Sequence, residues 1–192
     1  MGGEDLSALA RRAQAGEARA RHELLVELYG VVRRFVALLA RSATFADDAV
    51  QETMIAVHRG LDRFRGDASP RTWALTIAAR TVRRMRRREA RYALSDDGVI
   101  DAAVFDVDQV QAAELALLRR TLASLAPKKR DAFVLMEIFE LSATEAGKAL
   151  GTFANTAASR ARHARAELGE RLRARSVDEN GPLAATTGRG HG

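Results

Sequence analysis

Apolar residues recur every three or four positions along most of the chain, which is the spacing of one face of an amphipathic α-helix. The first pattern predicts a helix over residues 17–40, with buried positions at Leu24, Leu28, Val31, Phe35 and Leu38. The next predicts a helix over residues 46–64, with buried positions at Val50, Met54, Val57, Leu61 and Phe64. Together these patterns indicate an all-α fold.

A third helix is expected to begin at Ser69-Pro70, because a capping residue followed by proline suits a first helical turn. Its predicted buried positions are Ala74, Ile77, Ala78, Thr81, Val82 and Met85. The periodicity stops in the acidic stretch 93–108 and resumes at Leu115, Leu118, Leu122 and Leu125. Further helices are expected at about 128–140, 143–150 and 154–171.

These helices predict two small helical domains joined by an acidic linker. The expected divisions are a first domain at 1–92, the linker at 93–112, a second domain at 113–172 and a tail at 173–192. The tail has little to bury, so we expect it to be disordered.

Charge is unevenly distributed over this organisation. The net charge of the 192 residues is +6, yet residues 80–91 alone sum to +6 while residues 93–118 contain no Lys or Arg. A basic block beside an acidic one indicates a polyanion partner for the first and a solvated linker for the second. The chain has no cysteine, which excludes disulfides and thiolate metal sites. Its N-terminus is polar and its apolar runs are short, so we expect no membrane insertion and a cytoplasmic location.

The basic block is the stretch "RTVRRMRRREAR" at residues 80–91, opposed only by Glu89. On a helix, Arg80, Arg84, Arg87 and Arg91 form one stripe that faces away from the apolar positions. Such like charges repel by a few tenths of a kcal/mol per pair, and an ordinary solvated face would include more Glu. The clustering favours phosphate binding over a solvated surface, although phosphate contacts carry no base specificity.

A polar loop precedes this stripe, in "LDRFRGDASPRTWALTIA" at residues 61–78. It lies between Phe64 and Trp73. Taken alone, Trp73 is best interpreted as a core residue. A polar loop between aromatic residues and beside a cationic stripe is also suited to holding an unstacked base.

The second helix has an unusual outer face, which presents Asp48, Gln51, Glu52, Ile55 and Arg59. An exposed isoleucine with a polar rim is typical of an interface anchor. A single exposed apolar residue is also common, so the residues alone leave both interpretations open.

Residues 141–165 have the pattern of a helix-turn-helix. Ser142 and Glu145 have capping-box spacing, Gly147 indicates a close helix crossing, and Thr152 is expected to cap the second helix. With Ala157, Ala161, Ala164 and Leu168 buried, the outer face would present Asn155, Ser159, Arg162 and His163, with Arg160 and Arg165 placed for phosphates. This arrangement suits a recognition helix in a major groove, and a hairpin used only for packing is the alternative.

Three stretches together resemble the extracytoplasmic-function group of sigma-70-type transcription initiation factors. They are "DDAVQETMIAVHRGLDRF", "FRGDASPRTWALTIA" and "LASLAPKKRDAFVLMEIFELSATEAGKALGTFANTAASRARHAR". They look like the polymerase-binding helix, the region that opens and reads the minus-ten promoter element, and the domain that reads the minus-thirty-five element. The resemblance covers about residues 5–170 and implies a first domain like sigma region 2 and a second like region 4.

The resemblance implies a role for each motif. Core RNA polymerase would be bound by Asp48, Gln51, Glu52, Ile55 and Arg59. Minus-ten promoter DNA would be bound by Phe64, Arg65, Asp67, Ser69, Arg71, Trp73, Thr76, Arg80, Arg83 and Arg84. Minus-thirty-five DNA would be bound by Asn155, Thr156, Ser159, Arg160, Arg162 and His163. It also implies an anti-sigma factor as a regulatory partner, and it implies no cofactor or metal.

Two other classes of function remain as alternatives. A stand-alone helix-turn-helix regulator would bind an operator without polymerase. An enzyme acting on nucleic acid would need a catalytic constellation, but the histidines are scattered and no glycine-rich phosphate loop is present. We therefore expect a non-enzymatic, alternative sigma factor that directs promoter-specific transcription initiation.

Overall fold

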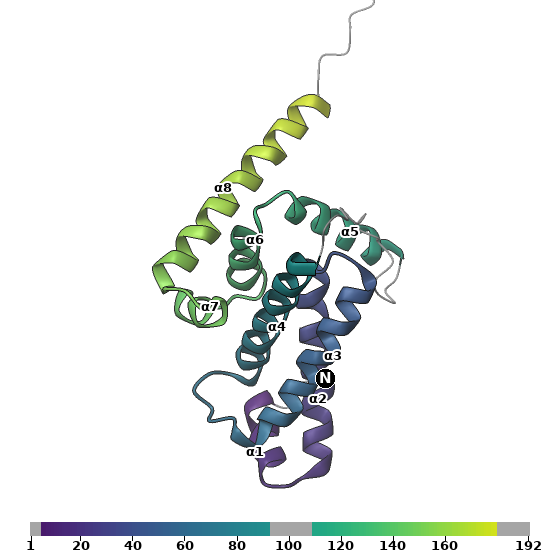
Figure 1. Cartoon of the computed structure of the whole chain (residues 1–192), viewed down its shortest axis with the longest axis vertical. Helices are drawn as coiled ribbons and strands as arrows, with labels where there is room; N and C mark the ends of the chain where they lie inside the picture. The colour runs from purple at the N-terminus through teal and green to yellow at the C-terminus, as the bar shows by residue number, and fades with distance from the viewer. Residues whose placement is uncertain (1–4, 93–108, 180–192) are drawn as a thin grey trace, which may run out of the picture.

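The computed structural model describes residues 5–92 and 109–179, and within these ranges the chain is helical with no strand (Figure 1). The helices of the first unit are α1 (Leu6–Gln14), α2 (Ala18–Leu39), α3 (Ala43–Gly60), the short 3-10 helix η1 (Leu61–Arg63) and α4 (Pro70–Tyr92). Those of the second unit are α5 (Gln109–Ala123), α6 (Pro127–Phe133), the π-helical segment η2 (Val134–Ile138), α7 (Ala143–Leu150) and α8 (Ala154–Glu179). The predicted all-α fold is confirmed.

The first unit is a bundle in which α2, α3 and α4 pack on one another. The predicted stripe of α2 is buried, and Leu24, Leu28 and Phe35 have no exposed surface. On α4 the buried face is formed by Ala74, Leu75, Ala78, Ala79, Thr81 and Val82. Small residues at four of these six positions allow the α4 backbone to approach its neighbours closely.

Helix α1 was not anticipated from the periodicity, and it braces the far end of the bundle. Asp5 caps it by accepting a hydrogen bond of 3.1 Å from the Ser7 N–H. At its other end the Gln14 amide donates to the carbonyls of Leu61 and Phe64, at 2.9 and 2.7 Å. These bonds fix the backbone where η1 passes into the loop ahead of α4.

In the second unit α8 packs on α6 and α7, and its far end extends away from the body of the molecule (Figure 1). The predicted contact residues Ala157, Ala161, Ala164 and Leu168 are all buried. The capping box of α7 is formed, with the Ser142 hydroxyl accepting from the Glu145 N–H and the Glu145 carboxylate accepting from the Ser142 N–H. The hydroxyl and N–H of Ser142 also hold the pKa of Glu145 below its usual value.

The two units are in contact in this structure. The rings of Phe35 on α2 and Phe139 meet edge to face, with centroids 5.5 Å apart. Arg86 of α4 donates to Asp131 at 2.8 Å and to the Leu39 carbonyl at 2.8 Å. The buried Arg119 donates to the Ala40 carbonyl at 3.3 Å, so it and the partly buried Arg86 meet adjacent carbonyls at the end of α2.

Several boundaries differ from those expected. The linker was expected at 93–112, but α5 begins at Gln109 because Gln and Ala are good helix formers. The tail was expected from 173, but α8 continues to Glu179. The helix expected at 128–140 is α6 followed by the π-helical turn. The acidic stretch 93–108 and the last residues, 180–192, lie outside the described residues.

A substitution in α2 tests this account of the core. Leu28→Ala removes a side chain with 0% exposure and is expected to lower the free energy of unfolding by about 2–5 kcal/mol. The control is Val26→Ala on the same helix, where the side chain is 55% exposed and a change of about 0.5 kcal/mol or less is expected. Urea unfolding followed by circular dichroism measures both, and equal losses would contradict the assigned face.

Candidate functional site

The outer face of α3 carries the residues expected to bind polymerase. Asp48, Gln51 and Arg59 are exposed, Glu52 is half-buried, and Ile55 is 43% exposed. The opposite face is buried through Ala49, Val50, Thr53 and Val57. Glu52 forms an ion pair with Arg84 of α4, which joins this face to the arginine stripe. The five residues therefore share one face with an apolar centre and a polar rim.

A hollow of about 570 Å³ lies beside this face, between α2 and α3. Its walls include Val26 and Tyr29 of α2, which are 55% and 46% exposed. Sequence reasoning did not assign these two residues to the surface. Their exposure could have been predicted from the sequence, because both are large apolar side chains that fall outside the buried stripe of α2.

The loop before α4 is held at both ends and exposed in its middle. At its start lie the carbonyls held by Gln14, and at its end the Ser69 hydroxyl accepts a hydrogen bond of 3.1 Å from the Thr72 N–H. Gly66 has φ +76°, a conformation that favours glycine. Arg65, Asp67 and Ser69 are exposed between these points. Because hydrogen bonds fix both ends of this short loop, its exposed side chains are held in a defined arrangement.

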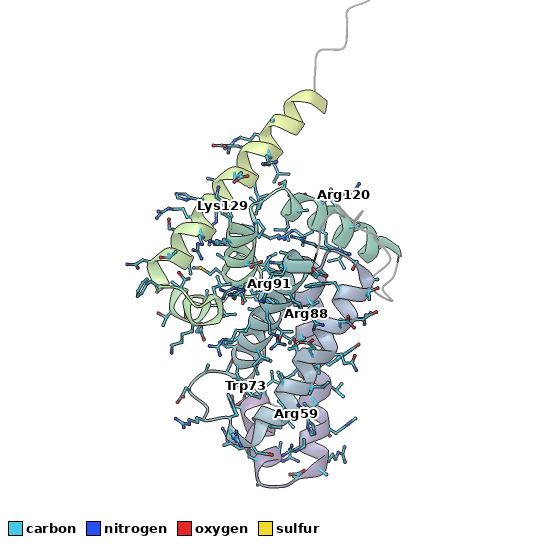
Figure 2. All side chains as sticks on the ribbon, in the orientation of Figure 1. Arg59, Trp73, Arg88, Arg91, Arg120 and Lys129 are labelled. Carbon is cyan, nitrogen blue, oxygen red and sulfur yellow. The ribbon has the colours of Figure 1, made fainter. Side chains whose placement is uncertain are left out.

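The aromatic pair beside this loop is formed as part of the bundle. The rings of Phe64 and Trp73 lie 5.0 Å apart and tilted by 43°, and both side chains are half-buried. Trp73 lies against Gly60, where an added Cβ would come within 3.0 Å of its ring. Figure 2 shows Trp73 near the start of α4, beside the loop. Thr76, one turn further along, donates to the Thr72 carbonyl.

The arginine stripe of α4 is partly covered by the second unit. Arg80, Arg84, Arg87 and Arg91 are exposed, but Arg80 donates to the Lys148 carbonyl at 3.4 Å. Arg83 is half-buried and donates to the carbonyl of Leu150 at the end of α7. Burial lowers the pKa of Arg83, and the nearby Arg87 lowers it further. Arg71 lies over the ring of Phe139, 5.8 Å from its centre.

The outer face of α8 remains open. Asn155, Arg162 and His163 are exposed, while Thr156, Ser159 and Arg160 are half-buried at the same end of the helix. Arg165 pairs with Glu137. The structure thus brings the six expected residues together on the first turns of one helix, as a groove-reading helix requires.

Metal-binding clusters and membrane-spanning helices are both absent from residues 5–92 and 109–179. No group of three or more His, Asp or Glu side chains is placed there to hold a metal ion. None of the described helices is long and apolar enough to cross a membrane.

Both units match known family models. Sigma-70 region 2 matches residues 22–92, and Sigma-70 region 4 matches residues 115–168. The first match contains the α3 face, the loop and the arginine stripe. The second contains the helix-turn-helix.

Curated relatives share both regions in one chain. The RNA polymerase sigma factor NccH of Alcaligenes xylosoxydans xylosoxydans is 35% identical over 182 residues, which cover 88% of this chain and 96% of that protein. The ECF RNA polymerase sigma factor SigM of Mycobacterium tuberculosis is 30% identical over 160 residues, covering 82% of this chain and 80% of that protein.

Solved structures agree in fold. CnrH in complex with the cytosolic domain of CnrY superimposes with a TM-score of 0.64 at 27% identity, over 87% of this chain and 96% of that one. The sigma factor RpoE from Bartonella quintana, in complex with the anti-sigma factor NepR, has a TM-score of 0.60 at 23% identity, over 78% of this chain and 94% of that one. The second likeness shows the fold alone.

The contact between the two units can be tested with Asp131→Asn, which removes the carboxylate that pairs with the partly buried Arg86. We expect the units to separate more often, because Arg86 loses the carboxylate that offsets the desolvation of its guanidinium group. The chain contains no cysteine, so spin labels at Glu27→Cys and Glu170→Cys report the distance between α2 and α8. Glu137→Gln, in an exposed ion pair, is the matched control and should leave the distance distribution unchanged. An unaltered distribution for Asp131→Asn would refute the role of this pair.

Proposed function

The chain belongs to the sigma-70 family and is an alternative RNA polymerase sigma factor of the extracytoplasmic-function group, and we propose which of its surfaces carries each step of promoter recognition. The observation that carries the proposal is the separation of three polar surfaces onto the outer faces of α3, α4 and α8. Members of this family are generally not enzymes, and we propose that this chain likewise acts by binding alone.

Core polymerase is assigned to the α3 face. Ile55 supplies the apolar anchor, and Asp48, Gln51, Glu52 and Arg59 supply the rim, which is the usual composition of a specific protein interface. Val26 and Tyr29 extend the apolar area across the adjacent hollow. This assignment is supported by the 43% exposure of Ile55 among polar side chains, on a helix whose opposite face is buried.

Minus-ten DNA is assigned to the loop and to the stripe of α4. Phe64 and Trp73 offer aromatic surface beside the exposed Arg65, Asp67 and Ser69, which suits a base held out of the stack. Arg71 and Thr76 lie at the start of α4, and Arg80, Arg83 and Arg84 continue along it toward phosphates. Because Arg80 and Arg83 bond to α7 here, DNA binding requires the second unit to move away from α4.

Minus-thirty-five DNA is assigned to the first turns of α8. Asn155, Thr156 and Ser159 can hydrogen-bond to base edges, and Arg160, Arg162 and His163 can reach bases or flanking phosphates. The two DNA-binding helices belong to separate units, so they can lie on separate promoter elements once the units part.

An anti-sigma factor is proposed as the regulatory partner. The Bartonella quintana RpoE is complexed with the anti-sigma factor NepR, and CnrH is complexed with the cytosolic domain of CnrY. In this chain a hollow of about 520 Å³ between α2 and the second unit is lined by apolar residues that include Tyr29, Leu115, Leu118 and Phe139, and by Arg33, Arg34 and Arg71. An apolar segment with acidic flanks would match this lining. We place the protein in the cytoplasm, where polymerase and promoter DNA are found.

The direct test is transcription by purified core polymerase supplemented with this chain over a promoter library. Promoter-dependent transcripts are expected. A stand-alone regulator would instead bind a duplex operator without polymerase, so a gel shift with the free chain discriminates between the two. Tight, sequence-specific binding by the free chain together with no transcript would reverse the assignment.

Ile55→Asp tests the polymerase surface. We expect it to abolish binding to core polymerase, because it places a charge at the centre of the apolar anchor, while helicity by circular dichroism stays intact. Leu172→Asp introduces the same charge at a 55% exposed position of α8 and should leave polymerase binding unchanged. Native-gel assembly with core polymerase measures both. Normal assembly of Ile55→Asp would refute the assigned surface.

Arg80→Ala tests phosphate binding by the α4 stripe. For the assembled holoenzyme on promoter DNA, we expect the slope of log affinity against log salt to fall in magnitude by about one, since one phosphate contact is lost. Arg19→Ala, at a side chain that is 85% exposed on α2, is the control. Filter binding at several salt concentrations measures the slopes, and parallel slopes for Arg80→Ala and the unmodified chain would exclude this contact.

A further inference from the structure

Phe153 stands out on the surface of the second unit. Its side chain is 84% exposed, whereas the other exposed large apolar residues of the described chain lie between 38% and 55%. It lies immediately before α8, next to the exposed Asn155. Single exposed apolar residues are common on protein surfaces, so exposure alone does not mark Phe153 as a binding residue.

Phe153 also occupies an unusual position for an aromatic residue, at the start of α8. The Phe153 carbonyl accepts hydrogen bonds of 3.0 Å from the N–H groups of Thr156 and Ala157, so Phe153 holds the N-cap position of α8. We expected Thr152 to cap this helix. A phenyl ring cannot accept the hydrogen bond that Ser142 accepts at the start of α7, and Ser, Thr, Asp or Asn is preferred at this position.

Phe153 is also held in place rather than carried on a loose loop. A Cβ on Gly147 of α7 would come within 3.0 Å of the Thr152 carbonyl and 3.2 Å of the Ala154 Cα, so the backbone on both sides of Phe153 packs tightly on α7. Gly151 completes the turn at φ +60°. The ring is therefore presented at a fixed place at the N-terminal end of α8.

Phe153 thus departs from two local preferences, burial of aromatic rings and polar capping, with no compensating contact within the described residues. Such departures are characteristic of functional positions. The N-terminal residues of a recognition helix are those that reach base edges in the major groove. The apolar group that base edges offer there is the C5-methyl of thymine.

We propose that Phe153 is a specificity-determining residue that contacts a thymine C5-methyl group in the minus-thirty-five element. The proposal rests on the proposed function of α8 and deepens it, because it assigns an apolar preference beside the polar contacts of Asn155 and Arg162. The ring meets the methyl group at the groove surface. Apolar side chains that insert between bases are typical of minor-groove binding proteins, whereas a recognition helix lies in the major groove.

The experiment uses holoenzyme assembled from core polymerase and the full chain. The minus-thirty-five element is first recovered by selection from a random library, and each thymine in it is then replaced by deoxyuridine, which lacks only the methyl group. At one thymine we expect the replacement to weaken the promoter complex about fourfold, the value of one buried apolar carbon. Phe153→Ala should weaken the complex with thymine-containing DNA by a similar factor. The affinity of the Phe153→Ala holoenzyme should not change when that thymine is replaced by deoxyuridine.

Two further variants separate base reading from folding. Phe153→Ser supplies a capping hydroxyl, so it should raise the thermal midpoint of unfolding and still lose the preference for thymine. Arg162→Ala should weaken binding to the element and keep the methyl preference. A double-mutant cycle between the Phe153 variants and the methyl group isolates the contact.

The proposal would be overturned by a selected element without thymine, by a wild-type holoenzyme indifferent to the methyl group at every position, or by Phe153→Ala retaining the preference. A Phe153→Ala defect in assembly with core polymerase, with methyl preference unchanged, would assign the ring to a protein contact and also overturn it. If the unmodified holoenzyme shows no dependence on any upstream element, the proposed function of α8 fails, which is a distinguishable outcome.

Discussion

The packing of one face of α4 on α2 and α3 is the interaction on which the rest of the structure depends. The small buried residues of α4 bring it close to its neighbours, and its remaining circumference is then forced to carry the arginines of residues 80–91. An arginine cannot be buried without acceptors, so each of these side chains must reach solvent, a carboxylate or a carbonyl. The face proposed to bind DNA phosphates is therefore also the face on which the second unit packs.

The contact between the units has a polar and repulsive component. Arg86 and Arg130 lie near each other, and burial together with Arg86 lowers the pKa of Arg130 to about 10. Among the described residues, the Nε atoms of both have no hydrogen-bond partner, and Asp131 is the carboxylate that Arg86 reaches. Buried ion pairs of this kind add little net stability because desolvation offsets their attraction. Such an interface suits two units that, as proposed above, separate when the chain binds a promoter.

Each proposed surface lies on a rigid helix or on a loop anchored at both ends, so binding does not require the surfaces themselves to fold. Glu52 and Arg84 connect the polymerase face to the arginine stripe, and Arg83 connects the stripe to the end of α7. Residues of neighbouring proposed surfaces are therefore joined directly, by an ion pair in one case and by a hydrogen bond in the other. This continuity accounts for how a single partner covering the hollow between the units would hold several surfaces at once.

The sequence by itself determined most of the helices after α1, their buried faces and the outward direction of residues such as Ile55 and Asn155, because periodicity is a local consequence of helical geometry. It also carried the family resemblance in full. The tertiary structure alone decided that Arg83 bonds to Leu150 and that Arg86 meets Asp131, 45 positions away. The backbone carbonyl of any residue can accept a hydrogen bond, so such pairings cannot be predicted from the spacing of residue types along the sequence. The same holds for Phe153, whose role as N-cap in place of Thr152 depended on where α7 packs against the turn.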